Sequence, residues 1–301
     1  MDRLEAMAIL LRVVDKGSLS AASRDLGVPL ATVSRMLNDL ETHVGTKLLV
    51  RTTRKVALTD AGATYVASAR RILDQIDETE RIAAGEFHVP RGELILTAPI
   101  FFGRLHILPV VTEFLAAYPE INIRLALSDR NLHLVEDHVD LAVRIGPLPG
   151  STMIATRVGS MRTVVCASPK LLAGQGAPKS PEDLAVLPSV NFEFLSPASS
   201  WPFRLKDGAG ATHLPIRPRL SVTTAEAAVW AASEGVGVTR VLHYQCADAV
   251  RDGSLRIILA EFEVEPLPVR LLHVGRGALP TKTRFFIDFA AQRVRGRLSS
   301  L

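Results

Sequence analysis

The sequence has few cysteines, no long apolar run and no strong excess of charge, and each shortage excludes a class of protein. Its 301 residues include 2 cysteines, and the formal net charge is +4. Cys166 and Cys246 lie far apart, and neither has a second Cys or a His at metal-ligand spacing. We therefore predict two buried packing residues and no metal, disulfide framework or redox-sensing pair. The small positive excess permits an anionic partner but does not indicate one.

Membrane spans and export signals are not apparent in the sequence. No apolar run approaches the roughly 18 residues that a span needs, and residues 1–5 form no basic region leading into an apolar stretch. We therefore expect a cytoplasmic protein with no membrane partner. Hydrophobic residues make up 48% of the chain and charged residues 22%. These fractions are typical of folded proteins, and the length indicates more than one domain.

Three short helices are predicted at the start of the chain, spanning residues 2–16, 18–26 and 30–42. Asp2 and Ser18 are suited to cap the first two helices, and Gly17 and Gly27 follow them. Small residues at 21–22 allow the second helix to cross its neighbour closely. This spacing is typical of a helix-turn-helix.

The third helix has an outward face of short polar groups and one arginine, which suits the major groove of DNA. An ordinary solvated helix face is the alternative, and the next segment disfavours it. Residues 47–51 and 55–58 predict two short strands around a cationic turn, a wing placed to touch phosphates. The predicted DNA-contacting residues are Leu30, Thr32, Ser34, Arg35, Asn38, Arg51, Thr53, Arg54 and Lys55.

Over about sixty residues the pattern resembles the signature of LysR-type transcriptional regulators. The matching positions are Ala21-Ala22, Leu26, Val33-Ser34-Arg35, Leu40-Glu41, Gly45, Leu48-Leu49, Arg51, Leu58-Thr59 and Ala61-Gly62. Pro29 and Leu30 depart from the polar residues often found there. Leu30 could contact a thymine methyl group, so the preferred operator sequence cannot be carried over from relatives.

The segment from Thr59 to about Gly85 predicts a long helix. Apolar residues repeat at three- and four-residue steps, which favours a coiled-coil seam formed by Val66, Ala69, Leu73, Ile76 and Ala83. A helix packed on its own chain is the alternative. The resemblance implies paired linker helices, a homotetramer built as a dimer of dimers and a palindromic promoter site in double-stranded DNA.

Beyond a hinge at 88–92, strands and helices alternate, which predicts an α/β fold. The resemblance implies a periplasmic-binding-protein-like effector domain with two lobes. Matching details are Tyr118-Pro119, Asp140, Arg144-Ile145-Gly146, Ala167-Ser168-Pro169 and Gly235-Val236-Gly237. The predicted domains are 1–59 for the winged helix-turn-helix, 60–88 for the linker helix and 89–301 for the effector domain. Its lobes comprise about 92–162 plus 268–301, and about 163–267.

The candidate effector site lies at strand ends that face the cleft between the lobes. Its predicted residues are Thr97, Pro99, Phe101, Ser128, Arg144, Gly146, Thr223 and Thr224. Hydroxyls and free N–H groups at helix starts favour a small carboxylate as effector. For each residue alone, a helix cap or core position is the alternative. The aromatic group Phe192, Phe194, Trp201 and Phe203 is interpreted as lobe core rather than as a cleft wall.

Two other functions compete with that of a ligand-responsive regulator. An enzyme is disfavoured because the sequence has no Gly-rich phosphate loop, no His-Glu-x-x-His and no Gly-x-Ser-x-Gly. The histidines are scattered, and His106, His133 and His138 are predicted on helix surfaces. A repressor that ignores small molecules is the second alternative. We expect no cofactor, and RNA polymerase is a possible further partner.

Overall fold

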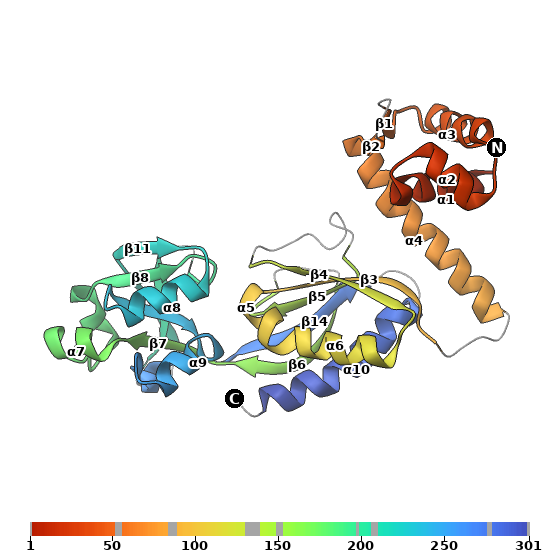
Figure 1. The fold of residues 1–301 in the computed structure, drawn as a ribbon. Helices are drawn as coiled ribbons and strands as arrows, with labels where there is room; N and C mark the ends of the chain where they lie inside the picture. Colours follow the sequence, from red (N-terminus) through yellow and green to blue (C-terminus); the bar gives the residue numbers. More distant parts are fainter. Residues whose placement is uncertain are drawn as a thin grey trace. The chain divides into compact units, whose positions relative to one another are not determined.

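The computed structural model describes residues 2–51, 56–83, 89–129, 139–148, 153–196, 199–205, 210–275 and 279–299. The chain divides into two compact units, Met1–Gly92 and Glu93–Leu301. Each unit is described by itself (Figure 1).

The first unit begins with three helices, α1 (Arg3–Lys16), α2 (Leu19–Leu26) and α3 (Leu30–Val44). The Asp2 carboxylate accepts from the amides of Leu4 and Glu5, and the Ser18 hydroxyl accepts from the Ala21 amide. Gly17 ends α1 in the left-handed region, at φ 70°. These contacts confirm the predicted caps and fix where each helix begins and ends.

A short hairpin and a long helix complete this unit. The elements are β1 (Leu49–Arg51), β2 (Val56–Leu58) and α4 (Asp60–Ala83). Val66 and Ala69 of α4 are buried, and Val66 belongs to the core of its own unit. The first part of the predicted seam is therefore packed on the same chain. Ile72 is 39% exposed, and Leu73 and Ile76 are half-buried.

A buried carboxylate joins α3 to β1. Glu41 is 4% exposed, and its carboxylate accepts from Lys47 Nζ at 2.7 Å and from the amides of Leu48 and Leu49 at 3.0 and 3.1 Å. Burial by itself raises the pKa of the Glu41 carboxyl. The hydrogen bonds from Lys47 and the two amides outweigh burial, so this pKa is lowered. Glu41 therefore stays charged while it holds the start of the hairpin against the helix.

The second unit has two lobes, each built on a five-stranded sheet. The first lobe contains β3 (Gly92–Ala98), β4 (Ile121–Leu127), β5 (Leu141–Ile145), β6 (Met153–Met161) and β14 (Leu267–Val274), in the order β4-β3-β5-β14-β6. Strands β3 and β5 are parallel, as predicted. Strand β14 is antiparallel to both of its neighbours, because it brings the chain back from the second lobe.

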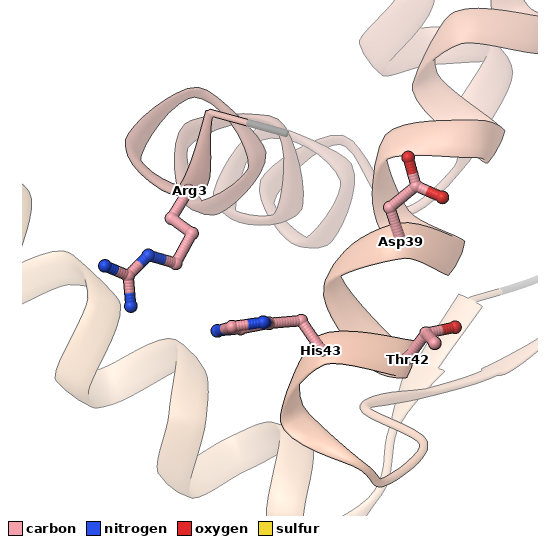
Figure 2. A pocket seen from close by; sticks show the side chains of 4 residues that line it. All are labelled: Arg3, Asp39, Thr42 and His43. Atoms are coloured by element: carbon pink, nitrogen blue, oxygen red, sulfur yellow. The ribbon is translucent and has the colours of Figure 1, made fainter.

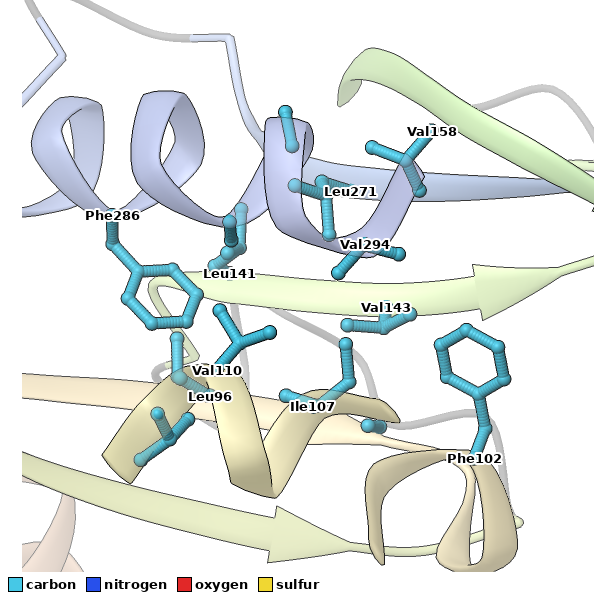
Figure 3. Close-up of a cluster of buried hydrophobic side chains, with 14 of the residues drawn as sticks. Leu96, Phe102, Ile107, Val110, Leu141, Val143, Val158, Leu271, Phe286 and Val294 are labelled. Carbon is cyan, nitrogen blue, oxygen red and sulfur yellow. The ribbon is translucent and has the colours of Figure 1, made fainter. Parts of the chain in front are cut away.

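The first lobe is covered by helical segments, namely α5 (Ile100–Phe102), the π-helical η1 (Gly103–Ile107), α6 (Leu108–Ala117) and α10 (Thr281–Leu298). Figure 3 shows Val110 and Phe286 from these helices meeting Leu141 and Val143 of β5 in the core. The window Ile100–Ala117 is long and apolar enough to cross a membrane by length and composition alone. The window contains Arg104 and Glu113, so it is not an uninterrupted apolar run. The buried side chains of this window belong to the lobe's core cluster.

The second lobe has the sheet order β11-β8-β12-β7-β13. Its elements are β7 (Thr163–Ala167), α7 (Pro169–Gln175), the 3₁₀ turn η2 (Pro181–Val186), β8 (Ser189–Phe192), β9 (Ser200–Arg204), β10 (Ala211–Pro215), β11 (Pro218–Val222), α8 (Ala225–Ser233), β12 (Val238–Leu242), α9 (His243–Arg251), β13 (Arg256–Ile258) and the 3₁₀ turn η3 (Ala260–Phe262). Strands β8, β11 and β12 are parallel, whereas β7 is antiparallel to both neighbours. The sequence also predicts a helix at 132–138, which lies outside the described residues.

Cys166 of β7 and Cys246 of α9 are both buried free thiols in one core cluster of the second lobe. Their burial confirms the prediction of packing residues. The fold brings them together although they are distant in sequence. Hydrogen bonding to Cys246, together with burial, raises the pKa of the Cys166 thiol well above its ordinary value. A thiol that stays protonated is a poor nucleophile.

Replacing Glu41 with Gln should destabilise the first unit by about 1–2 kcal/mol, because charge-assisted hydrogen bonds are exchanged for neutral ones. Far-UV circular dichroism during urea unfolding measures this loss. Both tryptophans, Trp201 and Trp230, lie in the second lobe, so their fluorescence transition should not move. Asp39→Asn changes the same charge on the exposed face of α3 and should have little effect. Equal midpoints for the two variants would contradict the role of Glu41.

Candidate functional site

Helix α3 has one buried face and one exposed face, as predicted. Val33, Leu37 and Leu40 are buried. Arg35 and Asn38 are exposed, Leu30 is 46% exposed at the first position of the helix, and Thr32 and Ser34 are half-buried. The outer face therefore offers a guanidinium, an amide and an apolar group, which are the groups that read base edges.

The predicted wing is described only in part. Arg51 ends β1 and pairs with Val56 of β2 in an antiparallel register. The Arg51 side chain and residues Thr53, Arg54 and Lys55 lie outside the described residues. The hairpin strands confirm the strand part of the prediction, and the phosphate contacts remain a prediction.

An open depression lies between α1 and α3 (Figure 2). It is lined by Arg3, Asp39, Thr42 and His43. Asp39 and Thr42 stand four and seven positions after Arg35, so they continue the exposed face of α3. Figure 2 shows His43 extending from α3 toward the side of Arg3. With cationic and anionic side chains side by side, the depression does not select a ligand of one charge.

The carboxyl ends of β3, β4 and β5 assemble half of the predicted effector site. Thr97 pairs with Ala142 in the parallel register of β3 and β5, and Arg144 stands two residues further along β5. The Ser128 amide donates to the Ala98 carbonyl at 2.9 Å. Pro99 is buried and precedes α5. Thr97 is fully buried, and its hydroxyl has no hydrogen-bond partner among the described residues.

Arg144 is a buried charged residue at these strand ends. It is 9% exposed, its Nη1 donates to the Val143 carbonyl at 3.0 Å, and its Nη2 is buried without a described partner. Burial lowers the pKa of Arg144, and the nearby Asp129 opposes this effect. Burial likewise raises the pKa of Asp129, whose carboxylate accepts from the Ile100 amide at 3.0 Å. Asp129 is not among the predicted residues, although it directly follows the predicted Ser128.

The second lobe contributes Tyr244, which sequence reasoning also missed. Its ring lies 5.9 Å from Phe101, 5.5 Å from Phe102 and 5.6 Å from His106, measured between centroids. The prediction of a surface His106 is wrong, because this residue is 7% exposed. It lies in the π-helical segment, whose wider turn shifts side chains relative to ordinary helical spacing. His133 and His138 lie outside the described residues.

The other predicted effector residues have backbone roles or are exposed. Gly146 has a φ of 107°, and its carbonyl accepts from Arg270 Nη1 at 2.8 Å. Thr224 caps α8 by accepting from the Ala227 amide, and Thr223 is exposed at the end of β11. These two threonines belong to the second lobe, so the predicted effector residues come from both lobes. The predicted aromatic group is core, as predicted: Phe192, Trp201 and Phe203 are buried, and Phe194 packs against the cluster that contains Phe192.

A helix-turn-helix joined to a two-lobed α/β domain is the architecture of a ligand-responsive DNA-binding regulator. Residues 4–63 match the family model "Bacterial regulatory helix-turn-helix protein, lysR family", and residues 88–295 match "LysR substrate binding domain". The chain therefore belongs to the LysR family of transcriptional regulators. It binds DNA through the N-terminal domain and has a C-terminal domain for a small-molecule effector.

Relatives match along almost the whole chain. An HTH-type transcriptional regulator of Xanthomonas campestris pv. campestris is 33% identical over 290 residues, which cover 95% of this chain and 84% of the relative. An HTH-type transcriptional repressor of Pseudomonas aeruginosa is 33% identical over 292 residues, covering 97% and 92%. The structure of CrgA, a LysR-type regulator from Neisseria meningitidis, superposes with a TM-score of 0.60 at 28% identity, covering 96% and 98%.

His106 predicts how the stability of the effector domain depends on pH. Burial, with a contribution from Arg297, lowers the pKa of His106 from 6.5 to about 4. Between these values the unfolded chain binds a proton that the folded chain does not, so stability falls as the pH drops through this window. His106→Phe should make the fluorescence-detected unfolding free energy less pH-dependent, by at most about 1.4 kcal/mol per pH unit. His213→Gln, an exposed control, should keep the wild-type slope; an unchanged slope in His106→Phe would contradict neutral burial.

Proposed function

We propose that this protein controls a promoter as a homotetramer, a dimer of dimers, and that a small carboxylate bound in the effector domain sets its activity. The carrying observation is Arg144, a buried guanidinium whose Nη2 has no hydrogen-bond partner among the described residues. It stands two residues after Ala142, the register partner of Thr97, whose buried hydroxyl also has no partner among them. A carboxylate accepts hydrogen bonds from both groups, which lowers the cost of burying them. The proposed effector residues remain those predicted from the sequence, with Asp129 and Tyr244 added.

The proposed domain division assigns 1–59 to the winged helix-turn-helix, 60–88 to the linker helix and 89–301 to the effector domain. The lobes are about 92–162 plus 268–301, and about 163–267. Helix α4 supports a dimer through its later turns. Val66 and Ala69 are used within the chain, whereas Ile72 is exposed, and Leu73 and Ile76 are half-buried, on a helix available to a second copy.

The proposed DNA target is a palindromic site, because two-fold related recognition helices read two half-sites about one helical turn apart. Contact with RNA polymerase at the promoter is part of the proposal. The relatives are transcriptional regulators, and we propose that this chain likewise acts without catalysing a reaction, in the cytoplasm where its DNA target lies.

Arg35→Ala should weaken binding to the specific site by about 1–3 kcal/mol, because a base-edge contact is lost. Arg54→Ala should weaken binding to all DNA and reduce the salt slope by about one. Fluorescence anisotropy against the intergenic DNA beside the gene, with random DNA as competitor, measures both effects. Arg124→Ala removes an exposed arginine of β4 and is the matched control. Unchanged specific affinity in Arg35→Ala would contradict the assignment of α3.

Arg144→Met should abolish the thermal stabilisation that benzoate or succinate gives the wild-type protein. A ligand present at about 100 times its Kd adds about 2.7 kcal/mol to the unfolding free energy. Arg124→Met should retain the wild-type response. If neither carboxylate stabilises the wild type while specific DNA binding is intact, the carboxylate proposal is wrong, and a repressor that ignores such ligands is favoured.

A further inference from the structure

Two segments of the chain cross between the lobes of the effector domain. The first crossing is Arg162 alone, because β6 ends at Met161 and β7 begins at Thr163. The second crossing is residues 259–266, which lie between β13 and β14. Met161 pairs with Leu267 on the side of the first lobe, so the two crossings leave that lobe side by side. A rotation of one lobe against the other must therefore change backbone angles in these two segments.

A bidentate ion pair joins the two crossings. Arg162 Nε donates to Glu263 Oε2 at 2.9 Å, and Arg162 Nη2 donates to Glu263 Oε1 at 2.8 Å. The Glu263 side chain is 14% exposed, so the pair is partly shielded from water and from salt. Donating to Glu263 raises the pKa of the Arg162 guanidinium. Two parallel hydrogen bonds also fix the direction of the planar guanidinium, so the pair holds one geometry.

Arg162 also holds the helix that contacts the first lobe. Its carbonyl accepts from the amide of His243, the first residue of α9, at 2.9 Å. The next residue is Tyr244, whose ring lies 5.5 Å from that of Phe102 in the first lobe. Arg162 thus connects the second crossing, through its side chain, to the aromatic contact between the lobes, through its backbone.

The second crossing begins in a backbone conformation that is costly for its residue. Leu259 has a φ of 56° and lies in the left-handed region, where the Cβ atom comes too close to the following carbonyl oxygen. Its side chain is 8% exposed and belongs to a core cluster of the second lobe. Such a conformation persists only where its surroundings determine it. The ion pair at Glu263 is a further constraint on the same short segment.

We propose that the Arg162–Glu263 pair is a clasp that keeps the two lobes in the arrangement of this structure. Breaking the pair releases the second crossing from the first, so other lobe arrangements become populated. The clasp deepens the proposed function, because it sets the lobe arrangement that an effector on Arg144 would meet, and it rests on that function only for its consequence at the promoter.

Spin labels on the two lobes measure this arrangement in the full-length protein. Asp288→Cys on α10 of the first lobe and Lys170→Cys on α7 of the second lobe replace exposed residues. Cys166 and Cys246 are fully buried and should stay unlabelled, which labelling of the unmodified protein checks. Double electron–electron resonance, with the labelled protein diluted in unlabelled protein, gives the distance between the labels within one copy.

The wild type should show one dominant distance. Arg162→Glu places two carboxylates at the clasp, and the fraction of molecules at the wild-type distance should fall to about half or less. Glu263→Gln removes the charge and should lower this fraction in the same direction. The charge swap of Arg162→Glu with Glu263→Arg restores an ion pair, and it should restore the wild-type distribution. Arg251→Glu removes the exposed pair with Asp248 on α9 and is the matched control, which should leave the distances unchanged.

The clasp is overturned if Arg162→Glu and Glu263→Gln keep the wild-type distances, or if the charge swap behaves as the single variants do. An equal loss in Arg251→Glu would overturn it as well. Tryptophan fluorescence checks that each variant is folded, and Glu263→Gln, which keeps the size and shape of the side chain, guards against misfolding of Arg162→Glu. No effector is added, so this result does not depend on the carboxylate proposal.

Discussion

The burial of Arg144 beside Asp129 is the constraint on which the effector domain depends. A guanidinium that is 9% exposed cannot be left to water, so its neighbours must hold it in place. The backbone carbonyl of Val143 and the charge of Asp129 do so only in part, since Nη2 keeps no described partner. The pair lies where β4 and β5 end, so the topology of the sheet, and not a local motif, creates this polar environment.

The DNA-binding unit also buries a charged side chain, Glu41, but there hydrogen bonds offset the cost of burying the charge. Glu41 is 4% exposed, against 9% for Arg144, yet its carboxylate accepts three hydrogen bonds. A satisfied buried charge stabilises one arrangement, because any movement of the hairpin would leave the carboxylate unpaired. A buried charged group that lacks a hydrogen bond can gain one from a ligand, and this gain favours binding. This contrast is the reason we assign Glu41 a structural role and propose a binding role for Arg144.

Features that depend on residues close together in the sequence could be predicted from it. The caps at Asp2 and Ser18 and the inner face of α3 follow from local chemistry and side-chain periodicity. So do β7 and β14, which the sequence predicts as strands at 163–167 and 267–274. Prediction failed at positions where segments that are distant in the sequence come together in the fold. Asp129 and Tyr244 enter the site through sheet order and through the second lobe, and His106 was misplaced by a π-helical turn. Strand β8 was missed because its four buried residues include two polar ones, which hides the apolar pattern.

The contact of Tyr244 with the first lobe suggests how binding could alter the arrangement of the lobes. Tyr244 comes from α9 of the second lobe, yet its ring packs on Phe101 and Phe102, close to the charged pair of Arg144 and Asp129. A ligand on Arg144 would therefore meet both lobes, and its free energy of binding would depend on their separation. Any such dependence shifts the population of lobe arrangements toward the one that binds better. In the proposed function, the buried charge, the strand-end hydroxyl and the aromatic contact would all act on this one equilibrium.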